Sequence, residues 1–284
     1  MAVLQALRDA VETLQRNPVL FVAAALYALA QTPGLLLQVA GNPLLNLASS
    51  GYNLLFYLVM PFFLGGTIAM AREGLSGPTD LSRLWTGGKR YYLRILVVVL
   101  IGLVAYFVVG FGMFMLVIAL VLALGANFES ALAGHGAGLG GMSMAAVALI
   151  GVLVLLFALV ILAVLFLLQF YAHAIVVDDA DAVGSLKRSY AVARGNVVSV
   201  LGYDLLATVL GLLIVAVPFA FVFVVAGGFG GLSAAAWSVR LAYVALTVVL
   251  SAVSGAFGLT FSTAFYVRLT DGNAGFGGAS SGGL

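Results

Sequence analysis

The sequence contains no cysteine and very little charge. Only 8% of its 284 residues are Asp, Glu, Lys or Arg, whereas a soluble globular domain carries about 25%. The absence of cysteine excludes disulfides, zinc sites with cysteine ligands, iron–sulfur clusters and a cysteine nucleophile. The shortage of charge leaves too little polar surface to keep a monomer in water. The composition therefore excludes an ordinary soluble protein.

Long apolar runs occupy most of the chain. Hydrophobic residues make up 64% of the sequence, and runs such as 95–124 and 144–177 exceed the roughly 20 residues that cross a bilayer. These runs are apolar on every side and lack the alternation of a transmembrane barrel. The sequence therefore predicts an all-α polytopic transmembrane helix bundle. Six spans are expected, at Pro18–Ala40, Leu44–Ala71, Leu93–Gly125, Met144–Val177, Val197–Ala226 and Val239–Val267.

The two ends of the chain differ from this pattern. Residues 1–16 place Leu4, Leu7, Val11 and Leu14 on one helical face, which predicts an amphipathic helix lying at the membrane interface. A cleaved signal peptide is the alternative, because Ala28-Leu29-Ala30 resembles a cleavage site, although the acidic residues near the start do not suit a basic leader. Residues 1–270 are expected to form one transmembrane domain. The Gly/Ser-rich segment 271–284 is expected to be a disordered tail.

The basic residues predict how the chain crosses the membrane. With six spans and a cytoplasmic N-terminus, the cytoplasmic segments hold eleven of the twelve Lys and Arg residues, and the outer segments hold only Arg240. Basic residues favour the cytoplasmic side. The protein is therefore expected to lie in the cell membrane with both termini in the cytoplasm. Arginine outnumbers lysine ten to two, which hints at a GC-rich prokaryotic genome.

Three segments that precede spans share a layout. They begin at Asp9, Asp80 and Asp181, carry apolar residues at helical spacing, and end in basic residues with Gly or Asn before the next span. An acid at a helix start and a base at its end suit the helix dipole. The pattern predicts three parallel units, 1–78, 79–180 and 181–270, each an interfacial helix followed by a hairpin. The alternative is that any loop between spans needs a basic amphipathic segment.

The stretch Gln169-Phe-Tyr-Ala-His-Ala-Ile-Val-Val-Asp-Asp, followed by Gly184-Ser-Leu-Lys-Arg-Ser-Tyr-Ala-Val-Ala-Arg-Gly-Asn, resembles a superfamily of uncharacterised prokaryotic six-helix membrane proteins. That group is common in haloarchaea and includes the membrane domain fused to some glycerophosphodiester phosphodiesterases. The resemblance covers about Gln169–Tyr203 and implies a fold. The phosphodiesterase chemistry of the fused members belongs to a separate soluble domain, so the resemblance assigns no catalytic residue here.

Three polar residues are candidates for a functional or structural role. Asp204 is the one acidic residue inside a predicted span, where an ionisable group is costly and often functional. It either pairs with a cation, for which Arg94 lies at a matching depth, or sits at headgroup depth and binds water. Arg240 either pairs with Glu129 or a lipid phosphate, or simply extends its side chain to the interface.

The remaining motifs do not indicate catalysis, metal binding or a cofactor. His173 and His135 have no carboxylates at ligand spacing, and Asp178-Asp179-Ala-Asp181 lacks the glycine and distal glutamate of a calcium loop. These acids are better interpreted as a solvated helix N-terminus. Small residues in the last span, namely Ser251, Ser254, Gly255 and Gly258, predict close helix packing.

Two functions remain open from the sequence. The first is a non-enzymatic membrane scaffold, assembly partner or lipid-interacting protein, with membrane lipids or other membrane proteins as partners and no role for nucleic acid. The second is a small-solute or lipid transporter. Its polar path would be lined by Asp204, Gln31, Gln38, Asn46 and Asn53. The sparseness of buried charge favours the first.

Overall fold

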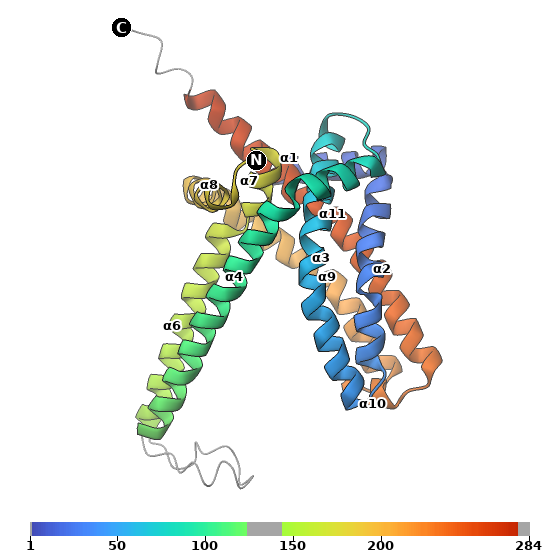
Figure 1. Cartoon of the computed structure of the whole chain (residues 1–284), viewed down its shortest axis with the longest axis vertical. Helices are drawn as coiled ribbons and strands as arrows, with labels where there is room; N and C mark the ends of the chain where they lie inside the picture. Colours follow the sequence, from blue (N-terminus) through green and yellow to red (C-terminus); the bar gives the residue numbers. More distant parts are fainter. Residues whose placement is uncertain (1, 124–143, 278–284) are drawn as a thin grey trace. The chain divides into compact units, whose positions relative to one another are not determined.

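The computed structural model describes residues 2–123 and 144–277, and within them every regular element is a helix (Figure 1). This confirms the predicted fold class. The helices are α1 (Ala2–Arg16), α2 (Val19–Val39), α3 (Pro43–Ser76), α4 (Leu81–Ala123), α6 (Met144–Leu168), α7 (Tyr171–Val177), α8 (Ala182–Gly195), α9 (Val197–Val225), α10 (Phe229–Ala234) and α11 (Trp237–Gly277). Glu129, His135 and the end of the predicted tail lie outside the described residues.

Six helical segments in the described part of the chain are long and apolar enough to cross a membrane, as predicted. They are Val19–Val39, Pro43–Ser76, Leu81–Leu120, Val147–Val177, Val197–Val225 and Trp237–Asp271. The third begins at Leu81 rather than Leu93, because the expected interfacial segment 80–92 is continuous with the span. The last helix continues to Gly277, into the segment expected to be a disordered tail.

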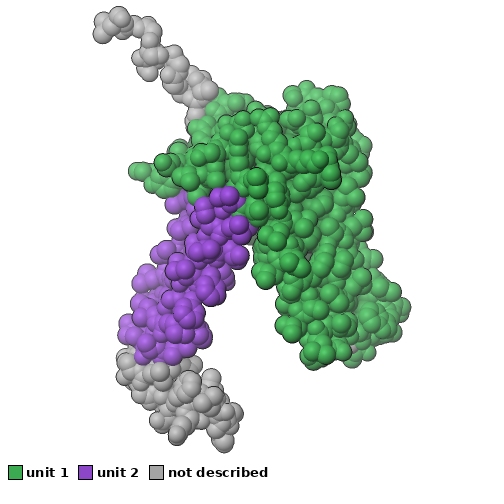
Figure 2. Space-filling model, viewed as in Figure 1, with its two compact units in different colours: residues 1–96, 170–284 green, residues 97–169 purple. Residues whose placement is uncertain are grey.

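The chain forms two compact units (Figure 2). Unit 1 consists of residues 1–96 and 170–284, and unit 2 of residues 97–169. Unit 2 contains the later part of α4 and α6. Unit 1 contains the remaining helices, with α2 packed against both α3 and α11. Its core cluster joins α1, α2, α3, α4 and α11 through Leu14, Leu20, Ala23, Ala24, Met70, Ala71, Leu84 and Ala256.

Helix α1 packs against α11 and α3 through small residues. Ala6, Ala10 and Thr13 are buried, together with Leu14. Leu4 and Val11, which belong to the predicted apolar stripe, instead remain 64% and 41% exposed. Of the predicted stripe, Leu14 therefore packs on the protein, whereas Leu4 and Val11 do not. Alanine and threonine are used on the packed face because short side chains allow two helices to approach closely.

The fourth predicted span is interrupted between α6 and α7. The Phe166 carbonyl accepts a hydrogen bond from the side-chain amide of Gln169 at 3.1 Å. The Phe170 amide donates instead to the hydroxyl of Ser189 in α8, at 3.0 Å. Side chains thus supply hydrogen bonds to the Phe166 carbonyl and the Phe170 amide at the break.

Facing glycines bring α3 and α4 into close contact. A Cβ atom added at Gly66 would lie 2.3 Å from the Leu84 carbonyl oxygen, and one added at Gly87 would lie 2.6 Å from the Ala69 Cβ. Gly88 faces Phe62 in the same way. The pair Gly87-Gly88 is part of a continuous helix, although glycine has a low helix propensity. Its role is to let two backbones touch.

Candidate functional site

The loop between α7 and α8 collects three carboxylates. Asp181 caps α8, because its Oδ1 accepts a hydrogen bond from the Gly184 amide at 3.0 Å. This confirms the interpretation of the acidic run as a helix N-terminus. Asp178 and Asp179 point elsewhere, towards arginines from other helices.

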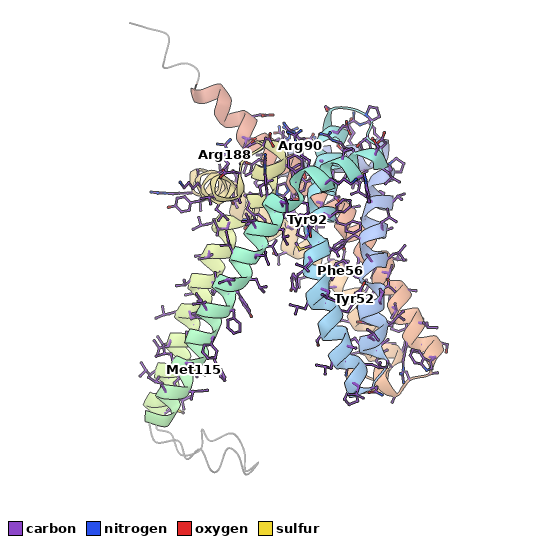
Figure 3. All side chains as sticks on the ribbon, viewed as in Figure 1. Tyr52, Phe56, Arg90, Tyr92, Met115 and Arg188 are labelled. Carbon is purple, nitrogen blue, oxygen red and sulfur yellow. The ribbon has the colours of Figure 1, made fainter. Side chains whose placement is uncertain are left out.

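Asp179 binds two arginines of α4. Its Oδ2 accepts from Arg90 Nη2 at 2.9 Å, and its Oδ1 accepts from Arg94 Nη1 at 2.7 Å (Figure 3 labels Arg90). The hydrogen bond from Arg94, and then the charge of Arg90, hold the pKa of this carboxyl below its ordinary value. Asp179 has a φ of 54°, a left-handed conformation that Asp and Asn tolerate better than most residues. A short loop can therefore turn and still present its carboxylate to α4.

Asp178 connects α8 to α11. Its Oδ2 accepts from Arg188 Nε at 2.8 Å and from the Tyr266 hydroxyl at 2.6 Å. The hydrogen bond with Asp178 raises the pKa of the Arg188 guanidinium, which therefore stays charged. Nearby, Arg72 Nη1 donates to the carbonyl of Val176 at 3.1 Å, near the end of α7. The loop thus links α3, α4, α7, α8 and α11 at one end of unit 1.

His173 lies beneath this loop in an aromatic cluster. It is 5% exposed, its Nε2 is 3.0 Å from the Ser262 hydroxyl, and its ring stacks on Tyr266 with centroids 5.7 Å apart. Phe170 contacts both His173 and Tyr203 through ring faces and edges. No group of three or more His, Asp or Glu side chains in the described ranges could hold a metal ion. The other ring nitrogen of His173, Nδ1, is buried without a hydrogen-bond partner in the described residues, and the geometry is that of an aromatic packing centre.

The three candidates from the sequence have different surroundings. Arg94 makes its described contacts with Asp179 and with the carbonyl of Ala180, so its carboxylate partner is not Asp204, as the sequence suggested. Asp204 is half-buried near the start of α9 and interacts with a neighbouring group.

Arg240 binds backbone carbonyls at the opposite end of the α2–α11 pair. It donates to Ala235 at 2.9 Å, to Ala40 at 3.1 Å and to Val39 at 3.2 Å, and it lies over the Trp237 ring. The end of α2 has orphan carbonyls that need donors, and Arg240 supplies them. Its proposed partner Glu129 lies outside the described residues.

The sequence did not reveal a division among the basic residues. Arg90, Arg94, Arg188 and Arg268 form close ion pairs with aspartates. In contrast, four exposed cations bind neither a carboxylate nor a backbone carbonyl in the part of the chain that the structure describes, unlike Arg72, which is exposed but donates to the Val176 carbonyl. We call these the unpaired cations: Arg8, Lys89, Lys187 and Arg194. Figure 1 shows their helices, namely α1, the start of α4 and α8, at one end of unit 1.

Two of the unpaired cations lie beside exposed aromatic rings one helical turn earlier. Lys89 Nζ is 4.8 Å from the centre of the Trp85 ring, and Trp85 is 57% exposed. Arg194 Nη1 donates to the Tyr190 hydroxyl at 3.2 Å, and Tyr190 is 43% exposed. The spacing of four residues is visible in the sequence and would have indicated these pairs. A cation next to an exposed Trp or Tyr is typical of a side chain placed at lipid headgroup level.

Two pockets lie in unit 1. The first, of about 580 Å³, is formed by α1, α3 and α11 and is lined by charges of both signs, with Arg268 Nε 2.5 Å from Asp9 Oδ2 across it. The second, of about 360 Å³, lies between α2, α3 and α11. Of the residues expected to line a transport path, Gln31 lines the second pocket, and Asp204 lines neither.

Comparison with known proteins gives one match. No curated protein and no solved structure matches the chain. A family model described as a domain of unknown function, DUF7847, matches residues 1–269, which is nearly the whole chain and includes both units. With its six apolar helices, the chain is thus a multi-pass membrane protein that belongs to the DUF7847 family.

Proposed function

We propose that this protein is a non-enzymatic membrane scaffold that binds anionic lipid headgroups with one face. The observation that supports the proposal is the division of the basic residues. Arginines that pair with Asp178 and Asp179 stabilise the fold, whereas the unpaired cations are exposed and remain available for an external anion.

The chemistry of the face suits a membrane surface. A lysine or arginine near an anionic membrane contributes about 1 kcal/mol to binding, and four such residues on α1, α4 and α8 act together. Trp85 and Tyr190 add amphipathic rings at the same level. Leu4 and Val11 on α1 are exposed beside them. Their exposure supports a position of α1 at the interface.

The proposal includes a cellular setting. The protein lies in the cell membrane of a prokaryote with both termini in the cytoplasm, so that the unpaired cations meet the anionic inner leaflet. A relation to the membrane domains of glycerophosphodiester phosphodiesterases, and to haloarchaeal proteins, fits a role in lipid organisation. Other membrane proteins could assemble on the same scaffold. Under the predicted threefold repeat, each of the three repeats would contain one interfacial helix.

The experiment compares two lipids that have the same acyl chains, one with an anionic headgroup and one with a headgroup of no net charge. The purified protein is heated in detergent with added phosphatidylglycerol or phosphatidylcholine of the same acyl chains. Phosphatidylglycerol should raise the melting temperature more, and salt should weaken the difference. Replacing all four unpaired cations by Gln should abolish the difference.

The matched control keeps the charge. A variant with Arg8→Lys, Lys89→Arg, Lys187→Arg and Arg194→Lys should respond to phosphatidylglycerol as the wild type does. Equal stabilisation of the wild type by both lipids would contradict the proposal. So would a full response in the four-Gln variant.

A transporter is the alternative, and one observation counts in its favour: Gln31 lines a pocket between spans. However, Gln38, Asn46 and Asn53 are exposed rather than directed to a common path. Uptake by protein-containing vesicles tests the alternative. Solute or lipid movement that depends on Asp204 would favour it over the scaffold.

A further inference from the structure

Three transmembrane helices each present one face to the second pocket of unit 1. Helix α2 contributes Ala24, Tyr27 and Gln31, which follow one another at helical spacing. Helix α3 contributes residues from Met60 to Thr67, and α11 contributes residues from Ser251 to Leu259. All of these positions lie inside the spans. The pocket is therefore placed at membrane depth, where a ligand arrives from the hydrocarbon and not from water.

The pocket is mainly apolar, with a few polar groups and no charged residue in its lining. Its lining contains the Gln31 amide, the Tyr27 hydroxyl, and hydroxyls from Thr67, Ser251 and Ser254, but no Asp, Glu, Lys or Arg. Tyr27 and Gln31 share a hydrogen bond, and Ser254 Oγ donates to the Ser251 carbonyl at 3.3 Å. Such a lining favours a neutral ligand, because transferring an ion to this site costs several kcal/mol more than transferring a neutral group.

Thr67 provides the observation that points to a ligand. Its side chain is 2% exposed, yet its hydroxyl makes no hydrogen bond to any group in the described ranges, and it lines the pocket. A hydroxyl that lines a pocket in this way is available to hydrogen-bond to a ligand group. The hydroxyl of Ser251 lines the same pocket and likewise has no described partner.

Small residues keep the pocket open. The sequence predicted that Ser251, Ser254, Gly255 and Gly258 mark close helix packing. A Cβ atom at Gly258 would meet nothing within 4 Å, and one at Gly255 would make only an ordinary contact of 3.7 Å with Ala24. The prediction of close packing is therefore wrong at Gly258. Around Gly255 the small residues leave a space of about 360 Å³, which lies within the range of small-molecule sites.

We infer that this pocket binds an uncharged amphiphile, with an apolar chain and a hydroxyl or carbonyl head that hydrogen-bonds to Thr67 and Gln31. A pure hydrocarbon would make no hydrogen bond to the Thr67 and Ser251 hydroxyls, and a phosphate head would bring an uncompensated charge into the bundle. The apolar chain would lie against Phe63, Leu64 and Leu259. The site differs from the unpaired cations, which attract anionic heads, so it stands independently of the proposed function.

The first test identifies the head group on the purified full chain in detergent. The probes are a diacylglycerol, an isoprenoid quinone, and a phosphatidic acid with the acyl chains of the diacylglycerol, each with a photoreactive group in the chain. We expect saturable labelling of residues between Met60 and Leu64 by the diacylglycerol or the quinone. If the diacylglycerol labels at lower concentration than the quinone, the site prefers a hydroxyl head. The opposite order shows a preference for a carbonyl head. Phosphatidic acid should label this segment at least tenfold more weakly.

The second test removes single polar groups. Thr67→Val keeps the side-chain shape, and Gln31→Leu keeps much of the volume, so each should weaken the neutral probe about fivefold, the loss expected for one hydrogen bond. Thr208→Val changes an exposed threonine in α9 and should leave binding unchanged. Ser251→Leu fills the pocket and should abolish saturable labelling. Each variant is used only if its melting temperature shows a cooperative transition.

The inference is overturned if phosphatidic acid binds as tightly as the diacylglycerol at this segment. It is also overturned if Thr67→Val and Gln31→Leu bind the neutral probes as the wild type does. If Ser251→Leu does not fold, these two substitutions alone decide. Labelling spread evenly over lipid-facing helices, without saturation, would show bulk solvation by lipid and would also overturn it.

Discussion

At the scale of single residues, the two neighbouring acids of the α7–α8 loop bind side chains from three helices, α4, α8 and α11. Asp179 holds Arg90 and Arg94 of α4, and Asp178 holds Arg188 of α8 and Tyr266 of α11. Exposed ion pairs contribute little individually. Here, however, each carboxylate accepts two hydrogen bonds, so losing one acid releases two partners together.

Asp179→Asn tests this connection without disturbing the backbone. Asn tolerates the left-handed conformation as well as Asp does, so the substitution removes charge while keeping the loop geometry. The melting temperature in detergent should fall, because both guanidinium groups of α4 lose their charged partner. Asp271→Asn, at an exposed position of α11, is the control and should have a smaller effect. Equal melting temperatures for the two variants would contradict the role of Asp179.

The ion pairs of Asp179 with Arg90 and Arg94 make the stability of the folded protein depend on pH in a defined direction. The folded-state pKa of Asp179 is lowered below the ordinary value of 3.8, chiefly by the hydrogen bond from Arg94. The contribution of Asp179 to the free energy of unfolding is therefore fully present above the unfolded-state pKa. It is lost as the pH falls through the lowered folded-state pKa. Asp80, whose pKa is lowered by the Ser82 hydroxyl, adds in the same direction. Melting temperatures measured from pH 6 to roughly pH 3 should fall less steeply in Asp179→Asn than in the wild type.

The sequence indicated which residues carry charge but not which charges meet. Arg94 and Asp204 lie at similar depths in their spans, which made them plausible partners. The pairing of Arg94 with Asp179 joins residues 85 positions apart and depends on where the α7–α8 loop folds. Helical periodicity contains no information about such contacts. It did predict the Asp181 cap, because a cap depends only on the residues next to it.

At the scale of elements, helix existence was predicted well, and helix ends and helix contacts were predicted less well. The break after α6 depends on Gln169 and on Ser189 from another helix, and a long apolar run gives no sign of it. Conversely, Gly87-Gly88 has a low helix propensity, but α4 is continuous there and contacts Gly65 and Gly66. In both cases packing between helices overrides local preference.

The glycine contact between α3 and α4 can be tested by adding one methyl group. In Gly66→Ala the new Cβ would lie 2.3 Å from the Leu84 carbonyl oxygen, so the two backbones must separate. The expected loss is about 1–3 kcal/mol, the usual cost of overpacking. Gly102→Ala is the control on α4, since its Cβ would meet nothing within 4 Å. Its thermal stability should be unchanged or slightly raised, because Ala is the better helix former. A similar loss in both variants would show that the α3–α4 contact is not tight.

At the scale of the whole molecule, composition alone predicted a six-span helical protein, because spanning a bilayer imposes length and apolarity on every segment. The second pocket could not be predicted, since it depends on how α2, α3 and α11 meet. The same holds for the unpaired cations, which are distinguished from the others only by where the aspartates fold. The parallel repeat stays a prediction, as does the orientation in the membrane.

The orientation is best tested by labelling single cysteines, since the natural chain has none to interfere. Ser189 is buried and accepts a hydrogen bond from the Phe170 amide, so a cysteine there would report packing instead of sidedness. Ser76, exposed at the end of α3, is the better cytoplasmic position, and Ser130 samples the expected outer loop. Ser130→Cys should react with a membrane-impermeant thiol reagent in intact cells. Ser76→Cys should react only after lysis, because Ser76 is expected on the same side of the membrane as eleven of the twelve basic residues, the cytoplasmic side. The reverse pattern would place both termini and the unpaired cations outside, away from the anionic inner leaflet, and would remove the basis for lipid binding by that face.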